Sequence, residues 1–356
     1  MSELPPSSAK TATPDSPRIR KSWWITGAVL LVVTAAFALS RVGMLDLPSV
    51  PTGLRLEKSG LSGLPEMKIL NAALYSDAKT GADTAAAGPL SEPAKNVQSG
   101  IAKVRGGDVA AGLEQMRQGI QQDPKNYVLA NAYRMIVFGL RRDFLAAARR
   151  ESQATPKFPP ELERQPIVFF EELDRAHGSR ETKMHLSLAW IDEMLLFPAL
   201  EIKAPSSVQA VNILTDVIDH DNAVYVPALF ARGLNHLHRP ARLVWPEAAK
   251  TPPDAAARDL GLCVAIGRKL DVGSPRLHAR LALNLGDAYV KAGRLNVARS
   301  WWQIAENLSR EEEVQAAVHR RFGWQNEELL DRLEEELDRG RAEIEHPMTD
   351  LAMMWN

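Results

Sequence analysis

The stretch from Trp23 to Leu39 reads WWITGAVLLVVTAAFAL and contains no charged residue. In an α-helix, about 18 residues span roughly 27 Å, which is close to the thickness of the hydrocarbon core of a bilayer. The two tryptophans at its start favour the headgroup region, and Arg41 follows its end. We therefore predict one transmembrane helix over residues 23–40, in contact with the lipid bilayer.

The orientation of this helix follows from the basic residues around it. Several of them precede the apolar stretch, namely Lys10, Arg18, Arg20 and Lys21. Only Arg41 follows directly. Positive charge is retained on the cytoplasmic side of a membrane, so residues 1–22 are predicted to be cytoplasmic. We predict a single-pass protein of the bacterial inner membrane whose C-terminal domain is periplasmic.

A cleaved signal peptide is the competing interpretation of the same stretch. The tripeptide Ala36-Phe37-Ala38 has the small-x-small form that signal peptidase accepts. Against cleavage, the preceding polar region is long and the apolar run continues to this tripeptide without a polar break. Both interpretations send the rest of the chain to the same compartment.

Two segments of the chain lack the periodicity of regular structure. Residues 1–22 are rich in Ser, Pro and Thr and are expected to be a disordered tail. Residues 41–98 contain many Pro and Gly residues, which predicts a spacer between the membrane and the domain. A short helix is expected near Glu66–Tyr75. The alternative is that part of this spacer packs on the domain as an irregular strap.

From about residue 99 to residue 323, apolar residues recur with the spacing of α-helices, interrupted by short turns that contain Pro or Gly. Helices of this length with short connections form antiparallel pairs. The predicted fold is therefore all-α, a solenoid of helical hairpins. The expected helices are 108–123, 126–141, 143–152, 166–176, 180–197, 206–219, 225–238, 254–270, 276–292, 294–308, 311–322 and 324–345.

One hairpin carries a family resemblance. The segment Ala279–Arg310 resembles a tetratricopeptide repeat, in which small and large residues alternate at fixed positions so that two helices can interlock. Ala282 replaces the first tryptophan of that family and Arg310 replaces its closing proline. The resemblance predicts a set of packing residues, namely Leu285, Gly286, Tyr289, Gly293, Ala298, Trp302 and Ala305.

Two further segments resemble the same repeat in part. Residues 107–124 contain the turn glycine, the alternation of small and large residues and the final proline, but the residues before Gly107 are poorly patterned. Residues 209–233 show a similar order in which the spacing slips by about one turn. The resemblance to tetratricopeptide repeats therefore covers roughly a third of the chain.

For the C-terminal residues 324–356, the pattern predicts a charged helix followed by an apolar tail. Leu330, Leu333, Leu337 and Ile344 form one apolar stripe among many carboxylates. Such a helix suits the polar cap of a solenoid, and the alternative is a coiled-coil contact with another chain. The tail is expected either to fold back on the domain or to dock in a neighbour. Its candidate partner-binding residues are Met353, Met354 and Trp355.

Composition and motifs argue against several classes of function. The formal net charge is −1, so there is no basic field to attract nucleic acid. The single cysteine, Cys263, lies in an apolar helical setting and excludes an intramolecular disulfide. His236 and His238 stand two residues apart and would point away from each other on a helix. Phosphate-binding, zinc-protease, hydrolase and haem-attachment motifs are absent from the sequence. We predict no cofactor, no metal and no catalytic residue.

The predicted function is that of a scaffold, adaptor or assembly subunit that binds proteins of a membrane-associated complex. Solenoids bind peptides or helices on one face. Polar residues displaced from the packing positions are the candidate contributors to that face, namely Asn284, Asp287 and Lys291. One alternative is an envelope hydrolase or lyase with a dispersed active site. Another is a supporting subunit of a redox complex.

Overall fold

The computed structural model describes residues 47–48, 55–56, 70, 90–151, 157–163, 165–196, 200–219, 223–224, 226–239, 254–270, 275–343 and 349. All of these belong to one compact unit, residues 45–356. The predicted tail 1–22, the predicted transmembrane segment 23–40 and the tail residues 353–355 lie outside the described residues. A search of the described helices finds none with the length and apolar character of a membrane span.

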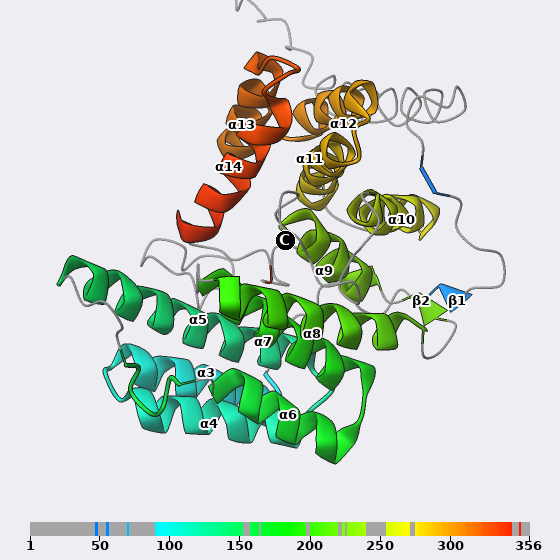
Figure 1. Cartoon of the computed structure of the whole chain (residues 1–356). Helices are drawn as coiled ribbons and strands as arrows, with labels where there is room; N and C mark the ends of the chain where they lie inside the picture. Colours follow the sequence, from blue (N-terminus) through cyan, green and yellow to red (C-terminus); the bar gives the residue numbers. More distant parts are fainter. Residues whose placement is uncertain are drawn as a thin grey trace, which may run out of the picture. The chain divides into compact units, whose positions relative to one another are not determined.

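Helices dominate the part of the chain that the structure describes, as predicted (Figure 1). Two short strands, β1 (Arg55–Leu56) and β2 (Ala223–Val224), pair in parallel. The helices are α3 (Glu92–Arg105), α4 (Val109–Gln122), α5 (Tyr127–Arg150), α6 (Gln165–His177), α7 (Arg180–Leu196), α8 (Leu200–Asp219), α9 (Val226–Leu237), α10 (Ala255–Leu270), α11 (Pro275–Lys291), α12 (Leu295–Leu308), α13 (Glu312–Gly323) and α14 (Leu329–Glu343).

Neighbouring helices pack as hairpins. The closest pairs are α3 with α4, α7 with α8, α9 with α10 and α11 with α12 (Figure 1). The helices α5, α7, α9, α11 and α13 also pack against one another in that order, and we call this series the odd row. Contact between every second helix is what stacked hairpins produce. The architecture is therefore an all-helical repeat.

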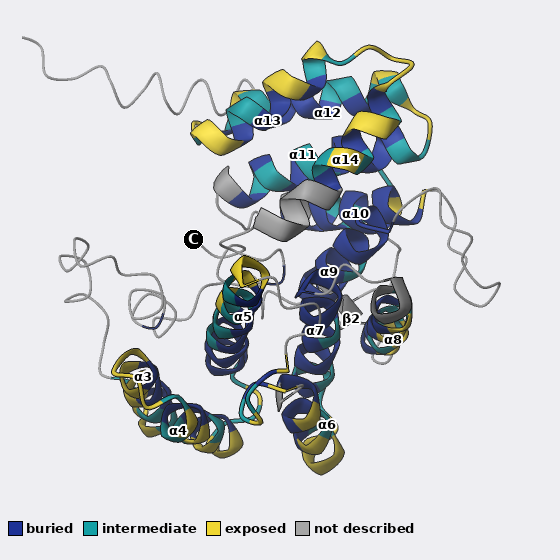
Figure 2. Cartoon of the chain, turned by 60° about the vertical axis from the view of Figure 1, so that its left-hand side comes forward, coloured by how far each residue is buried: buried dark blue, intermediate teal, exposed yellow. Residues whose placement is uncertain are grey.

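Burial differs between the helices. Figure 2 shows that α7 and α9 are buried along most of their length, whereas α3, α4 and α6 expose one face. Several helices have a side-chain N-cap: Ser91, Asp108 and Asn126 each accept a hydrogen bond from a backbone N–H of the first turn. These caps satisfy amides that lack a partner within the helix. The odd row thus contains the most buried helices of the domain.

Several predicted boundaries differ from the structure. The helix α3 begins at Glu92, before the predicted domain start at 99. The segments 126–141 and 143–152 form the single helix α5, because neither proline nor a turn separates them. The helix α8 begins at Leu200 and accommodates Pro205 in its first turns, whereas the prediction started after that proline.

Parts of the predicted spacer contact the domain. The strand Arg55–Leu56 pairs with residues of the connection that precedes α9. Leu70 is fully buried, and the side chains of Leu47 and Pro48 lie over Gly261 of α10. These described residues of segment 41–98 therefore contact the domain.

Candidate functional site

The hairpin of α11 and α12 interlocks through one glycine and one tryptophan. A Cβ atom on Gly286 would lie 2.4 Å from Cδ1 of Trp302, so no larger residue fits there. Gly293 has a φ of +74°, a left-handed conformation that favours glycine in the turn between the helices. The remaining predicted packing residues are buried, namely Leu285, Tyr289, Ala298 and Ala305.

Asp287 occupies a different place from the one predicted. Only 1% of its surface is exposed, and its carboxylate lies between three helices. It accepts a hydrogen bond of 2.9 Å from Nε1 of Trp302 and two bonds of 2.6 and 2.8 Å from Arg321. The prediction that Asp287 faces a partner is therefore corrected: its side chain joins α11, α12 and α13 inside the domain.

Lys291 lies at the end of α11 and is also held by the protein. Its Nζ atom donates to the backbone oxygens of Leu237 and Arg239, where the helix α9 ends. A positive charge at this end complements the helix dipole. The same ammonium forms an ion pair of 2.7 Å with Glu334 of α14. Asn284, the third predicted partner-binding residue on α11, is half-buried.

The helix α14 lies along the odd row. Its backbone packs against α11 and α7, two helices far apart in sequence (Figure 2). Leu329, Leu333 and Leu337, spaced by four residues, are buried on one side. The polar cap predicted for 324–356 is thus a helix that bridges separate repeats rather than one that covers only the last hairpin.

Arg321 is the centre of the charges under α14. Besides its ion pair with Asp287, it forms one of 2.7 Å with Glu336 of α14. Glu336 also forms an ion pair of 3.1 Å with Arg320. Burial lowers the pKa of Arg321, but its charge interactions and hydrogen bonds with Asp287 and Glu336 together outweigh burial and raise this pKa above its usual value. Burial likewise raises the pKa of Glu336, while its bonds to the two arginines bring the net pKa below the usual range. Arg321 and Glu336 are therefore both charged at neutral pH.

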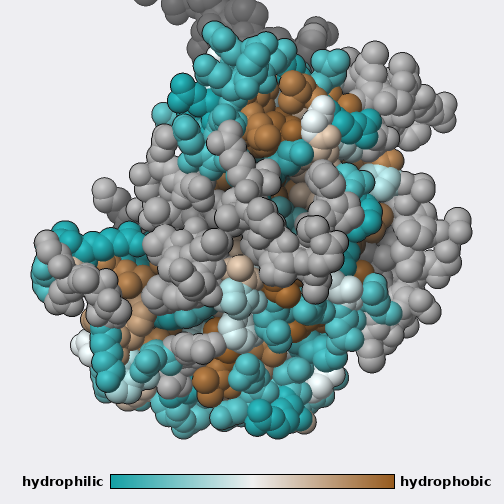
Figure 3. Space-filling view, in the orientation of Figure 1, coloured by the Kyte–Doolittle hydropathy of each residue, from teal (hydrophilic) through white to brown (hydrophobic). Residues whose placement is uncertain are grey.

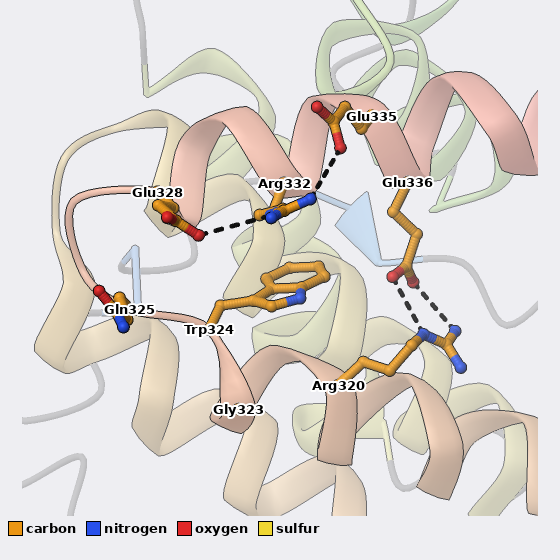
Figure 4. Close-up of a pocket in the computed structure, with 8 residues that line it drawn as sticks. All are labelled: Arg320, Gly323, Trp324, Gln325, Glu328, Arg332, Glu335 and Glu336. Carbon is orange, nitrogen blue, oxygen red and sulfur yellow. Dashed lines mark hydrogen bonds and ion pairs between the residues drawn. The ribbon is translucent and has the colours of Figure 1, made fainter.

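A hollow of about 390 Å³ lies between the end of α13 and the helix α14 (Figure 4). The indole of Trp324 lies between the two helices in this view, and Arg332 bridges Glu328 and Glu335 at 3.5 Å each. Two arginines and three glutamates line the hollow, so their charges nearly balance. Such an open, charge-paired surface lacks the unbalanced field that would concentrate an ionic substrate.

A second buried cluster receives the end of the chain. Arg134 of α5 donates to Asp192 of α7 at 2.7 Å and to the backbone oxygen of Thr349 at 2.6 Å. The hydroxyl of Thr349 donates to the other oxygen of Asp192. All three residues are buried. At Thr349 the tail therefore contacts the odd row, in agreement with the expectation that it folds back on the domain, although its partners Arg134 and Asp192 were not predicted.

The buried histidines are not among the residues that line the hollow. Burial lowers the pKa of His185 well below its usual value and that of His236 to about 3. Burial also raises the pKa of Cys263 well above its usual value, so the thiol stays protonated. Across the described residues, no three potential ligand side chains gather into a metal site.

Comparison with known proteins adds little to this geometry. No family profile and no curated protein sequence matches the chain. A crystal structure of a thermophilic tetratricopeptide repeat protein from Thermus thermophilus matches with 15% identity and a TM-score of 0.40. The match covers 65% of this chain and 100% of that protein. A likeness this low establishes no relationship, and the description of the helical repeat rests on the contacts given above.

Proposed function

We propose that this protein is a non-catalytic scaffold that binds helical segments of other proteins along its odd row. The observation that carries the proposal is the way in which α14 is held. The row receives this helix through a stripe of leucines and through ion pairs with Lys291 and Arg321. A surface that seats an amphipathic helix has the chemistry to seat another one.

The surface of the domain supports a binding role. On the face shown in Figure 3, hydrophobic side chains reach the surface near α12 and α13 and again near α5 and α6, between hydrophilic ones. On α6, Val168 is 43% exposed. Groups with strongly shifted pKa values, such as His185 and His236, are buried and do not line the hollow beside α14. This separation favours binding over the alternative of a dispersed active site.

The proposed location is the periplasmic face of the inner membrane, with residues 23–40 as the anchor. The uncharged run and the basic residues before it support this topology. Fusions of a reporter to the C-terminus test it, because alkaline phosphatase is active outside the cytoplasm and a cytosolic reporter inside it. We expect phosphatase activity and digestion of the domain by protease added to spheroplasts. Active cytosolic reporter and protection from protease would refute the location.

The binding role is tested by photo-crosslinking in cells. A photoreactive amino acid placed at Asn284 on the odd row is expected to give a discrete adduct with another protein. The matched control is Gln303 on α12, which is exposed on a helix outside the row. Equal adducts from both positions, or adducts from Gln303 only, would contradict a binding surface on the odd row.

A further inference from the structure

The C-terminal helix is attached to the odd row by bonds that a partner could replace. In α14, the apolar residues Leu329, Leu333 and Leu337 share one side, and Glu334 and Glu336 extend from the flanks of that side. This arrangement is that of a helical ligand with anchors spaced by four residues. The helices α7 and α11 of the row pack against α14, and the row supplies the two cations.

The charges specify the kind of helix that fits. Lys291 and Arg321 are almost fully buried beneath α14, with 8% and 4% of their side chains exposed. When α14 leaves, each of the two cations loses one carboxylate partner, so an occupant that brings acidic groups restores both ion pairs. The helix α14 does so, since Leu329–Glu343 contains six carboxylates and three arginines, a net charge of −3.

The far end of the same segment is anchored independently. Thr349 bonds to Arg134 and Asp192 on α5 and α7, whereas α14 itself bonds to α11 and α13. Together, α14 and Thr349 therefore contact four helices of the odd row, namely α5, α7, α11 and α13.

We propose that α14 is an exchangeable strap, and that the surface beneath it binds an acidic amphipathic helix of a partner protein after α14 is displaced. The inference rests on the proposed scaffold function and defines its ligand. Such a partner helix carries leucines four residues apart and two carboxylates on their flanks. The partner binds only when α14 has left the surface. Its apparent association constant is therefore the intrinsic one multiplied by the fraction of molecules in which the surface is open.

A first measurement requires no substitution. Hydrogen exchange of the full chain reports the free energy at which each helix opens. Because a strap opens while the repeats stay folded, the amides of α14 should exchange at least about tenfold faster than those of α11 and α12. If α14 exchanges together with α11 and α12, it is an integral part of the fold and the proposal is wrong.

A second measurement uses charge reversal in the full chain. The changes Glu334→Lys and Glu336→Lys place like charges against Lys291 and Arg321 and should release α14. A fluorescent peptide with residues 326–343 of the natural sequence should then bind about tenfold or more tightly than it binds the unchanged chain. A peptide that itself carries the two lysines should bind to neither.

The matched control reverses two exposed carboxylates of the same region, Glu327→Lys and Glu335→Lys, with the same change in net charge. It should leave peptide binding unchanged. Released α14 without any gain in peptide binding would overturn the proposal, and circular dichroism shows whether each variant is folded. If the charge-reversed chain does not fold, hydrogen exchange of the unchanged chain still tests whether α14 opens separately.

The two proposals can fail separately. Adducts at Asn284 in cells, together with an α14 that never opens, would support the scaffold function and contradict the exchange of α14. Tight peptide binding by the reversed chain, without adducts in cells, would retain the helix-binding surface and remove the scaffold.

Discussion

Two hairpins of the domain, α3 with α4 and α11 with α12, are held together in different ways. In the first, three glycines allow the backbones to touch: a Cβ on Gly112 would lie 2.6 Å from the backbone oxygen of Gly100, and one on Gly119 would lie 2.6 Å from that of Pro93. The buried residues of α3 and α4 are all apolar or glycine. This hairpin is complete in itself.

The second hairpin depends on helices outside it. Its buried carboxylate, Asp287, is neutralised by Arg321 from α13, and Arg321 in turn binds Glu336 from α14. A buried charge needs its partner, so this hairpin is stable only while α13 is in place. The comparison teaches that local packing makes a repeat self-sufficient, whereas a buried ion pair couples it to its neighbours.

The largest expected effect comes from removing the central cation. Arg321→Met leaves Asp287 buried with only Trp302 as a partner, and should lower the free energy of unfolding by about 3–5 kcal/mol. The double change Asp287→Leu with Arg321→Met should recover much of this loss, because it removes both charges. Urea denaturation followed by circular dichroism measures both.

The control for this experiment is Arg332→Met, an arginine of α14 whose side chain is 52% exposed. It should cost well under about 1 kcal/mol, as exposed ion pairs do. A loss at Arg321 no greater than that at Arg332 would show that the two hairpins do not differ in the way described.

The glycine-packed hairpin is tested by Gly112→Ala. The added methyl group meets the backbone of Gly100 and Val104 as well as the side chain of Val104, so the helices must separate, at a cost of about 1–3 kcal/mol. Hydrogen exchange should place the loss in α3 and α4 and leave α11 protected. Gly139→Ala in α5 is the control, because nothing lies within 4 Å of its added Cβ atom and alanine favours a helix. If Gly112→Ala loosens α11 as well, the first hairpin is not self-contained.

Acid should also separate the two regions. His236 on α9, the helix whose end binds Lys291, has a pKa of about 3 when folded, well below the value near 6.5 of the unfolded chain. The unfolded state therefore binds more protons between these values, and stability present above pH 6.5 is lost as the pH falls toward 3. At pH 5 the loss is about 2 kcal/mol.

The measurement is denaturation at several pH values between 7 and 4, with local protection followed by hydrogen exchange. Protection of α9 and α11 should fall with pH before that of α3 and α4, whose buried residues do not titrate. His236→Leu should flatten the pH dependence, and the control His319→Gln, an exposed histidine, should not. Parallel loss of protection in both regions would contradict the comparison.

The same contrast explains what could be predicted from the sequence. The interlock of Gly286 with Trp302 depends on residues within one hairpin, whose spacing is visible in the chain. The helix α3 was missed because two of its five inward residues, Ala94 and Gly100, are small and weaken the periodic signal. Polar residues are assigned to the surface by default, which misplaced Asp287.

The sequence does not identify the partners in long-range pairs. Arg134 lies within the buried stretch of α5, and an arginine there indicates a buried partner, but its partners lie on α7 and at Thr349. Nothing in the spacing of α14 distinguishes a helix that caps the last hairpin from one that lies on α7 and α11. The candidate site therefore required the structure, although its residue types were visible beforehand.

The smallest expected effects come from surface ion pairs, and they still separate the two regions. Lys95→Gln removes a pair with Glu92 in which both side chains are more than half exposed, and should cost less than about 0.5 kcal/mol. Arg320→Gln removes one of two arginines from Glu336 and should cost up to about 1 kcal/mol. Because Arg321 shares that carboxylate, the losses at Arg320 and Arg321 should not add in a double-mutant cycle. Additive losses would mean that α14 is held by independent contacts, and the coupling that distinguishes the second hairpin from the first would end at Asp287.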